Sequence, residues 1–397
     1  MTKDAIKERV RTLTNEMHKE VIGFREHLHS HPELSFQEHK TAKFIKEKLN
    51  LDEVEWKTGI AGTGMMLRIQ GNGPGKIIAL RADMDALPIT EKSTETYCSK
   101  NPGIMHACGH DVHSACLMGV ARLMHSLRDH WNGELRLIFQ LGEEKLPGGA
   151  SMMIKEGVLK SPDVECILAQ HVFPELKAGQ VGFRSGMYMA SADEIYLTIK
   201  GKGGHGAMPQ RNIDPVLISA HVLIALQQVI SRRADPTMPS VLSFGKIQGN
   251  GATNVIPDEV KLEGTLRTFD EAWRKQAHTL IRELAEQTSA AMGGSCEVDI
   301  VNGYPFLKND ESLTLRCKET AEGFLGKEMV FDLPLRMTAE DFAYYSHEVP
   351  ACFYRLGTAS GDGRNSESVH TASFDIDAMA LKTGVGLMSV LALDLLG

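Results

Sequence analysis

One short segment of this sequence concentrates side chains that bind metal ions. Residues 105–113 read MHACGHDVH and contain one cysteine, three histidines and one aspartate. Cys108 and His110 would project to the same side of an extended loop, whereas His110 and His113 would share one face of a helix. Either spacing can place two ligands on one metal ion. The alternative is a helix start that is capped by Asp111, with incidental histidines.

Two adjacent carboxylates could serve the same ion. Glu143 and Glu144 follow the apolar segment LRLIFQLG. One carboxylate could bind a metal while the other takes a proton from bound water. Taken alone, such a pair is more often solvated surface. His171 ends another apolar segment, where a single histidine is more often a core residue than a ligand.

Three further residues extend the ligand inventory. Asp83 and Asp85 follow the apolar segment KIIALR and would point the same way, either to bind a metal or to orient a ligating histidine. His370 lies in a polar loop before the last helical pattern, where it could be a ligand or part of a cap. Together these residues exceed the four ligands that a single structural zinc needs. The sequence therefore predicts a site for two ions.

Most of these groups follow a segment that is typical of a buried strand. Continuously apolar runs that each lead into a polar loop occur at 76–81, 135–140 and 166–172. Helical patterns separate them, as at 113–127. Buried strands that alternate with helices predict an α/β domain with a mostly parallel sheet flanked by helices, and sites in such sheets form at the carboxyl ends of the strands.

The pattern changes after residue 186. The predicted order there is strand, helix, two strands, helix and strand, which is the split βαβ unit, at 193–200, 215–232, 240–248, 259–267, 271–292 and 295–301. The α/β pattern then returns with a strand at 351–356 and a final helix. We therefore expect a discontinuous domain at 1–186 and 303–397, interrupted by a smaller α+β domain at 187–302.

Composition limits the classes of partner. The chain has 397 residues and a formal net charge of −8, which argues against a nucleic-acid binder because such a protein needs a basic face. The N-terminus is charged and no apolar run approaches the ~20 residues of a membrane span. Seven cysteines, an odd number, lie in apolar segments. We expect a cytoplasmic protein with reduced thiols and no membrane or nucleic-acid partner.

The order of these motifs resembles the family of metal-dependent aminoacylases and carboxypeptidases, and in particular its branch of N-acyl-L-amino acid, hippurate and auxin-conjugate amidohydrolases. The resemblance covers nearly the whole chain and rests on FREHLHSHPELSFQE, ALRADMDALPI, MHACGHDVHSA, EEKLPGGA, QHV, GKGGHGAMP, GATNVIPDEVKLEGTLRTF, AEDFAYY and VHTASFD. It implies a catalytic domain with an inserted, ferredoxin-like lid domain. It also implies a homodimer, possibly a tetramer, commonly formed through the lid.

The resemblance also implies roles for individual residues. It gives two divalent ions (zinc, manganese, nickel or cobalt) and leaves open which ligand bridges them. Glu143 would be the general base. The metal ligands would be Cys108, His110, Glu144, His171 and His370, and the supporting residues Asp83, Asp85, Asp111 and His113.

Three residues of the lid gain roles in the same way. His205 in GKGGHGAMP would reach the site of the neighbouring subunit and stabilise an oxyanion, whereas without the resemblance a loop histidine that caps the next helix is the simpler interpretation. Asn254 and Arg267 would contact substrate. The fork of an arginine can bind both oxygens of a carboxylate.

These roles predict hydrolysis of a small N-acyl amino acid or related amide by metal-activated water. Within the same family, a dipeptidase, a carboxypeptidase and a succinyl-diaminopimelate-type deacylase are alternatives. A different enzyme mechanism would use Cys108 as a nucleophile, with His110 or His113 as its base. A non-enzymatic alternative is a metal-binding protein that has lost catalysis.

Overall fold

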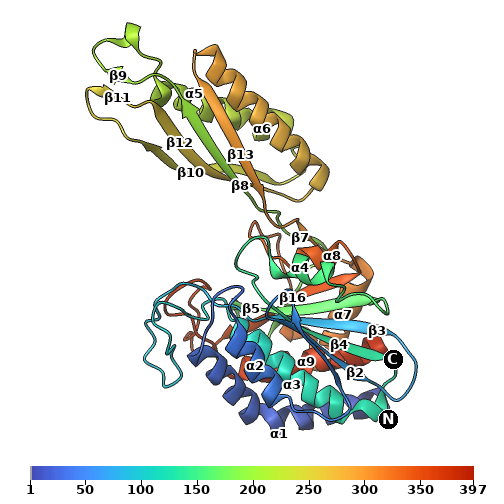
Figure 1. Cartoon of the computed structure of the whole chain (residues 1–397). Helices are drawn as coiled ribbons and strands as arrows, with labels where there is room; N and C mark the ends of the chain where they lie inside the picture. The colour runs from blue at the N-terminus through green and yellow to red at the C-terminus, as the bar shows by residue number, and fades with distance from the viewer. Residues whose placement is uncertain (1) are drawn as a thin grey trace. The chain divides into compact units, whose positions relative to one another are not determined.

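The computed structural model describes residues 2–397, which divide into two compact units. Unit 1 consists of Met1–Gly186, Lys308–Pro334 and Asp341–Gly397, and unit 2 of Met187–Leu307 and Leu335–Glu340. Figure 1 shows both. Unit 2 takes in more of the chain than the predicted 187–302. The segment after Leu335 belongs to it because Arg336 N donates to Tyr188 O at 2.9 Å.

Unit 1 is built on a mixed eight-stranded sheet of order β1-β2-β4-β3-β5-β16-β6-β15. Its centre is parallel, since β3 pairs with β4 and β5, and β5 with β16. Antiparallel pairing adds β1 and β2 on one side and β6 on the other. The bounds are β1 Glu55–Ile60, β2 Gly64–Gln70, β3 Ile77–Asp83, β4 Glu134–Gln140, β5 Cys166–Lys177, β6 Val181–Phe183, β15 Val330–Asp332 and β16 Ala351–Ala359.

Helices pack against this sheet and against one another. The helices α1, α3 and α9 contact each other, and α3 and α9 also contact β3. The helix α9 is apolar and long enough to cross a membrane, but most of it is buried inside unit 1, as expected of a core helix. The bounds are α1 Lys3–Ser30, α2 His39–Lys48, α3 His110–Ser126, α4 Gly149–Lys155, α7 Glu311–Leu325, α8 Ala343–Ser346 and α9 Met379–Leu396.

Unit 2 is an antiparallel sheet of order β10-β12-β8-β13 with two helices. Its main elements follow one another as β8 Asp193–Lys200, α5 Pro215–Gln228, β10 Ser240–Gly249, β12 Glu259–Thr268, α6 Glu271–Ala291 and β13 Ser295–Asn302. A small β-ladder joins β9 Gly204–His205 to β11 Val255–Ile256.

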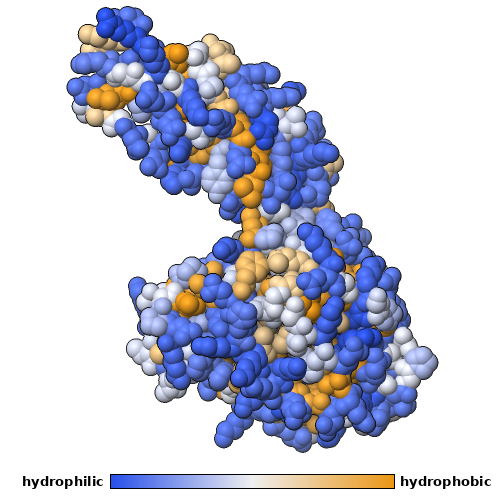
Figure 2. Space-filling view, viewed as in Figure 1, coloured by the Kyte–Doolittle hydropathy of each residue, from blue (hydrophilic) through white to orange (hydrophobic). Residues whose placement is uncertain are grey.

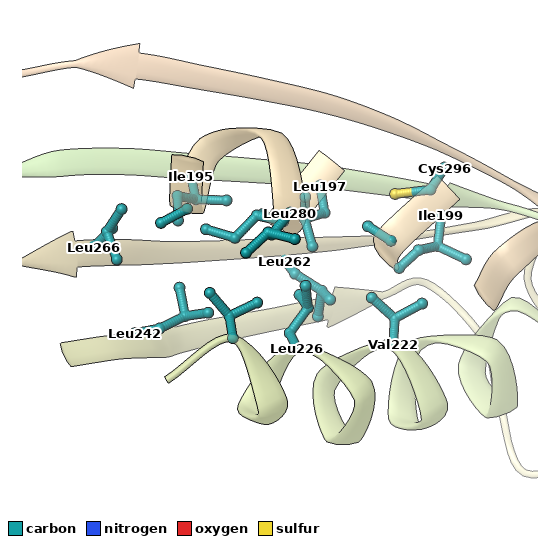
Figure 3. Packing of buried hydrophobic residues seen from close by; sticks show 14 of the residues in the cluster. Ile195, Leu197, Ile199, Val222, Leu226, Leu242, Leu262, Leu266, Leu280 and Cys296 are labelled. Carbon is teal, nitrogen blue, oxygen red and sulfur yellow. The ribbon is translucent and has the colours of Figure 1, made fainter. Parts of the chain in front are cut away.

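Alternation along β8 explains the core of unit 2. Ile195, Leu197 and Ile199 are buried while the residues between them face outward. They belong to one apolar cluster with Val222 and Leu226 of α5, which lie one helical turn apart (Figure 3). The helix starts where Asp214 caps it by accepting from Val216 N at 2.9 Å.

Candidate metal centre

A glycine turn brings the MHACGHD loop against strand β5. Gly109 has φ +79°, and a Cβ there would lie 2.6 Å from the side chain of Val172. Only glycine permits both this conformation and this close approach. Because the chain turns at Gly109, His110 is the first residue of α3 rather than part of an extended loop. Cys108 and His110 are thereby placed beside His171 on β5.

Four side chains converge around the thiol of Cys108. Its Sγ lies 3.5 Å from Nε2 of His171 and 3.3 Å from Nε2 of His370. Oε1 of Glu144 lies 3.3 Å from Nε2 of His370 and 3.9 Å from Nε2 of His110. Cys108 belongs to two groups whose ligand atoms lie within 4.8 Å of one another, one with His110 and His171 and one with Glu144 and His370. The structure thus brings together the residues that the sequence nominates as ligands.

Hydrogen bonds from Nδ1, the ring nitrogen that points away from the cluster, orient two of the histidines. Nδ1 of His110 lies 2.9 Å from Asp85 O, and Nδ1 of His171 lies 2.8 Å from Val172 O. Because each Nδ1–H donates to a carbonyl, Nε2 of each ring is left to face the cluster. Such bonds fix the tautomer of a ligating histidine.

Two buried atoms in the cluster lack a hydrogen-bond partner within the described residues. They are Nε2 of His110 and Oε1 of Glu144. An unsatisfied buried polar atom costs ~1–3 kcal/mol, a cost that a divalent cation bound at each of these atoms would remove. Thiolate, imidazole and carboxylate groups together suit zinc and neighbouring divalent metals. The residues therefore fit a divalent ion on either side of Cys108.

Carboxylates dominate the charge around the cluster, which suits a cation. Burial lowers the pKa of His110, but Asp83, Asp85 and Glu144 outweigh it and raise that pKa to about 10. Burial, and then the carboxylates of Glu144 and Glu143, raise the pKa of the Cys108 thiol well above its usual value. Burial, and then the nearby guanidinium of Arg355, hold the pKa of His171 well below its usual value, so its imidazole is neutral. A divalent ion would reverse the balance at the thiol and displace its proton.

His113 supports the site without being able to ligate. Its Nδ1 lies 2.6 Å from Oδ1 of Asp83, and its Nε2 accepts from Val172 N at 2.9 Å. Asp83, His110 and His113 are close enough to hold an ion, but both ring nitrogens of His113 are occupied. Asp83 also accepts from Arg81 at 2.6 Å. His113 of α3 is therefore hydrogen-bonded to β3 through Asp83 and to β5 through Val172.

Asp85 joins two of the ligands. Its Oδ1 lies 3.2 Å from Nδ1 of His110, and its Oδ2 accepts from Glu144 N at 3.0 Å and from Ser35 Oγ at 2.6 Å. Asp111, by contrast, is not the N-cap of α3, which is Gly109, and forms no side-chain hydrogen bond to the five proposed ligands within residues 2–397. Its Oδ2 instead accepts from Arg25 Nε at 2.9 Å.

Glu143 lies at the edge of the ligand cluster. It is buried and groups with His110 and Glu144 within 4.8 Å. Its Oε1 lies 3.3 Å from Asp341 N. The side chain of Asp341 accepts from Arg81 Nη2 at 2.8 Å, and also from the side-chain amide of Gln140 and the backbone of Ala150.

This network around Asp341 is absent from the sequence predictions. The signal that could have revealed it is Arg81, a charged residue at the end of a buried apolar strand, because a buried charge needs a partner. The motif AEDFAYY contains that partner.

The remaining predicted residues lie in unit 2. His205 on β9 pairs with Val255, and Gly206 N donates to Asn254 O at 2.8 Å, so His205 and Asn254 are neighbours. His205 is exposed, and its Nδ1 accepts from Ala207 N at 3.1 Å. Arg267 on β12 donates to Thr265 Oγ1 at 3.1 Å. Within residues 2–397, no carboxylate lies within ion-pair distance of Arg267.

The fold and this ligand cluster are those of a metal-dependent hydrolase. A family model, Peptidase family M20/M25/M40, matches residues 79–393. The chain belongs to this family.

Relatives and a solved structure extend the similarity over most of the chain. An N-acyl-L-amino acid amidohydrolase of Geobacillus stearothermophilus is 44% identical over 77% of this chain and 82% of its own length. An N-acetyl-L-cysteine deacetylase of Bacillus subtilis is 40% identical over 92% of this chain and 85% of its own. A solved Bacillus subtilis protein, described as a dinuclear metal binding peptidase, superimposes with a TM-score of 0.81 at 33% identity and covers 96% of this chain and 99% of its own.

Proposed function

We propose that this protein hydrolyses the amide bond of N-acyl amino acids with two divalent metal ions. The observation that carries the proposal is the sharing of Cys108 between two groups of ligands, with the carboxylate of Glu143 beside them. The names of the two curated relatives support the substrate class, because both describe removal of an acyl group from an amino acid.

Two groups of residues would hold the ions. Cys108, His110 and His171 would hold one, and Cys108, Glu144 and His370 would hold the other. This donor set suits zinc, and nickel, cobalt or manganese could also occupy it. When bound, a pair of divalent ions lowers the pKa of a shared water and polarises the carbonyl of the substrate.

Glu143 would move the proton. Its carboxylate would take a proton from the attacking water and pass it to the nitrogen of the leaving amino acid. The backbone N–H of Asp341 supports this role, because it lies within 3.3 Å of one carboxylate oxygen of Glu143 and keeps the group in place.

Residues of unit 2 would bind the substrate and the developing oxyanion. Since Nδ1 of His205 accepts from Ala207 N, the ring of a neutral His205 carries its proton on Nε2. Nε2 would therefore be a donor to an oxyanion, an interaction worth ~3 kcal/mol. The guanidinium of Arg267 would pair with the carboxylate of the amino acid, and Asn254, next to His205, would contact the acyl amide.

A homodimer would supply His205 to the partner's site. Val216, Leu217 and Ile224 of α5 are exposed, as are Val241 and Ile247 of β10, a strand at the edge of its sheet. Figure 2 shows apolar side chains at the surface of unit 2 among hydrophilic ones. An exposed apolar helix next to an unpaired strand edge favours association with a second copy.

The alternative in which Cys108 is a nucleophile is disfavoured by its surroundings. Reactive cysteines have a depressed pKa in electropositive sites, whereas burial and two carboxylates raise the pKa of this thiol. Chelation would distinguish the mechanisms, because it should abolish a metal-dependent activity and spare a thiol-dependent one.

The substrate class is tested with metal-free protein reloaded with each of the four metals. The panel would contain N-acetyl, N-benzoyl and N-succinyl amino acids, with unblocked dipeptides as the comparison. We expect the highest kcat/KM among the N-acyl amino acids. Preferred cleavage of dipeptides would replace the proposal with a peptidase function.

A further inference from the structure

One buried arginine joins the two segments that carry His110 and His370. Arg25 of α1 is 4% exposed. Its Nε donates to Oδ2 of Asp111 at 2.9 Å, and its Nη2 donates to Oδ1 of Asp375 at 2.7 Å. Asp111 follows His110 directly at the start of α3, and Asp375 lies in the loop that begins at His370. The guanidinium of Arg25 is therefore hydrogen-bonded to both segments that carry these proposed ligands.

Neighbouring bonds tie a third segment into the same network. His29, one turn after Arg25, donates from Nδ1 to Oδ2 of Asp111 at 2.8 Å, and its Nε2 lies 3.0 Å from Glu91. The hydroxyl of Tyr97 donates to Oδ2 of Asp375 at 2.8 Å. The loop that contains Glu91 and Tyr97 is thereby fastened to the loop that begins at His370.

The two groups of ligands differ in how firmly they are held. His110 and His171 are buried and lie on a helix and a strand. The side chain of His370 is 53% exposed. It lies in a loop and has φ +65°, a conformation that non-glycine residues rarely adopt. Its position therefore depends more on contacts outside the ligand cluster.

We propose that Arg25 is a positioning residue that fixes the His370 loop against α3 and so sets the affinity of the ion bound by Cys108, Glu144 and His370. This rests on the proposed two-ion function. The planar fork of a guanidinium can donate to two carboxylates at once, whereas a lysine ammonium is a point charge that cannot reproduce that geometry. Without the fork, the buried Asp111 and the half-buried Asp375 lose their shared partner. The His370 loop keeps its backbone bond from His370 N to Ala107 O and is held against α3 less firmly.

The test is a metal titration of Arg25→Lys followed by calorimetry and by the spectrum of bound Co²⁺. We expect the ion at His110 and His171 to bind as in the unchanged protein. The ion at His370 should bind ~10–100-fold more weakly, the usual cost of losing a group that supports a ligand. Tyr97→Phe, which removes only the hydroxyl bond to Asp375, should weaken the same ion by less.

Arg136→Lys is the matched control. Arg136 is as buried as Arg25 and pairs with Glu134 at 2.8 Å, but it lies on β4 and contacts none of the proposed ligands. We expect this variant to lose thermal stability and to bind both ions normally.

Several outcomes would contradict the inference. They are normal binding of both ions by folded Arg25→Lys, equal weakening of both ions, or the same loss in Arg136→Lys. If Arg25→Lys does not fold, unchanged metal affinities in Tyr97→Phe would overturn the inference.

The protein without substitutions separates this inference from the proposed function. If that protein binds only one ion, both this inference and the two-ion proposal are contradicted. An unchanged protein that binds two ions and cleaves no amide would contradict the proposed function alone.

Discussion

Nε2 of His370 lies 3.3 Å from Sγ of Cys108, although 262 positions separate the two residues in the chain. His171 approaches the same sulfur from β5 at 3.5 Å. The thiol thus belongs to both proposed groups of ligands, so we expect its removal to be the most damaging change to metal binding.

Replacement of Cys108 by alanine should remove both ions. The remaining groups would be His110 with His171 on one side and Glu144 with His370 on the other, too few to hold a divalent ion tightly. Cys108→Asp is the matched variant, because a carboxylate can also bridge two cations. Metal content after desalting, measured by mass spectrometry, should fall below one ion per chain in Cys108→Ala and stay near two in Cys108→Asp. Equal metal content in the two variants would argue against a bridging role.

Replacement of Glu143 by glutamine should separate catalysis from metal binding. The amide keeps the size of the side chain but cannot take a proton, so we expect kcat to fall ~10²–10⁴-fold with both ions bound. Glu144→Gln is the comparison, since it removes a proposed ligand and should lower metal content. Near-normal turnover by fully loaded Glu143→Gln would show that another group is the base.

Disruption of the exposed apolar face of α5 should produce monomers. Ile224 is 71% exposed, and Ile224→Lys would place a charge in the proposed dimer interface. Leu315→Lys is the control, because Leu315 is 57% exposed on α7 of unit 1. Light scattering should report a monomer for the first variant and a dimer for the second. If His205 acts across the dimer, the monomer should retain its metal and lose activity. An active monomer would exclude that role.

The stability of unit 2 should depend on pH through Asp193. Burial alone would raise the pKa of this carboxyl, but hydrogen bonds from Arg274 and His278 lower it to about 2. A carboxyl whose pKa is lower in the folded state stabilises the fold above its unfolded pKa of about 3.9. That contribution, about 2 kcal/mol, is lost as the pH falls towards 2.

Asp193→Asn should therefore destabilise unit 2 most at neutral pH. The difference from the unchanged protein in free energy of unfolding by urea, measured without metal, should be constant from pH 7 to 5 and should shrink below pH 4. A difference that persists undiminished at pH 3 would show that the bond geometry, and not the charge, provides the stability.

The apolar runs of the sequence predict the parallel centre of the unit 1 sheet but not its edges. The strands β3, β4 and β16 are buried along nearly their whole length, and β5 is buried from Cys166 to Phe173, so continuous apolar runs mark them in the sequence. The strand β1 is mostly exposed, and β6 and β15 have only three residues each, too few to show a period. Such short or exposed strands are stabilised by pairing with the neighbouring strand, and the local sequence pattern does not encode this pairing.

The ligands could be nominated from their residue types, whereas their supports could not. Cys108 and His110 stand out because residues 105–113 concentrate metal-binding side chains, and His171 because it ends an apolar segment. The pairing of Arg81 with Asp341 spans 260 positions, and that of Arg25 with Asp375 spans 350. Spacing along a chain carries no information about contacts at such separations, which the fold alone creates.

The most direct test of the two-ion mechanism is a titration of metal-free protein with Co²⁺ while the hydrolysis of an N-acetyl amino acid is followed. We expect no hydrolysis without metal, thiolate-to-cobalt absorption as the first ion binds Cys108, and full activity only after two ions are bound per chain. Hydrolysis by the metal-free protein, or full activity with Cys108 unbound to cobalt, would contradict it.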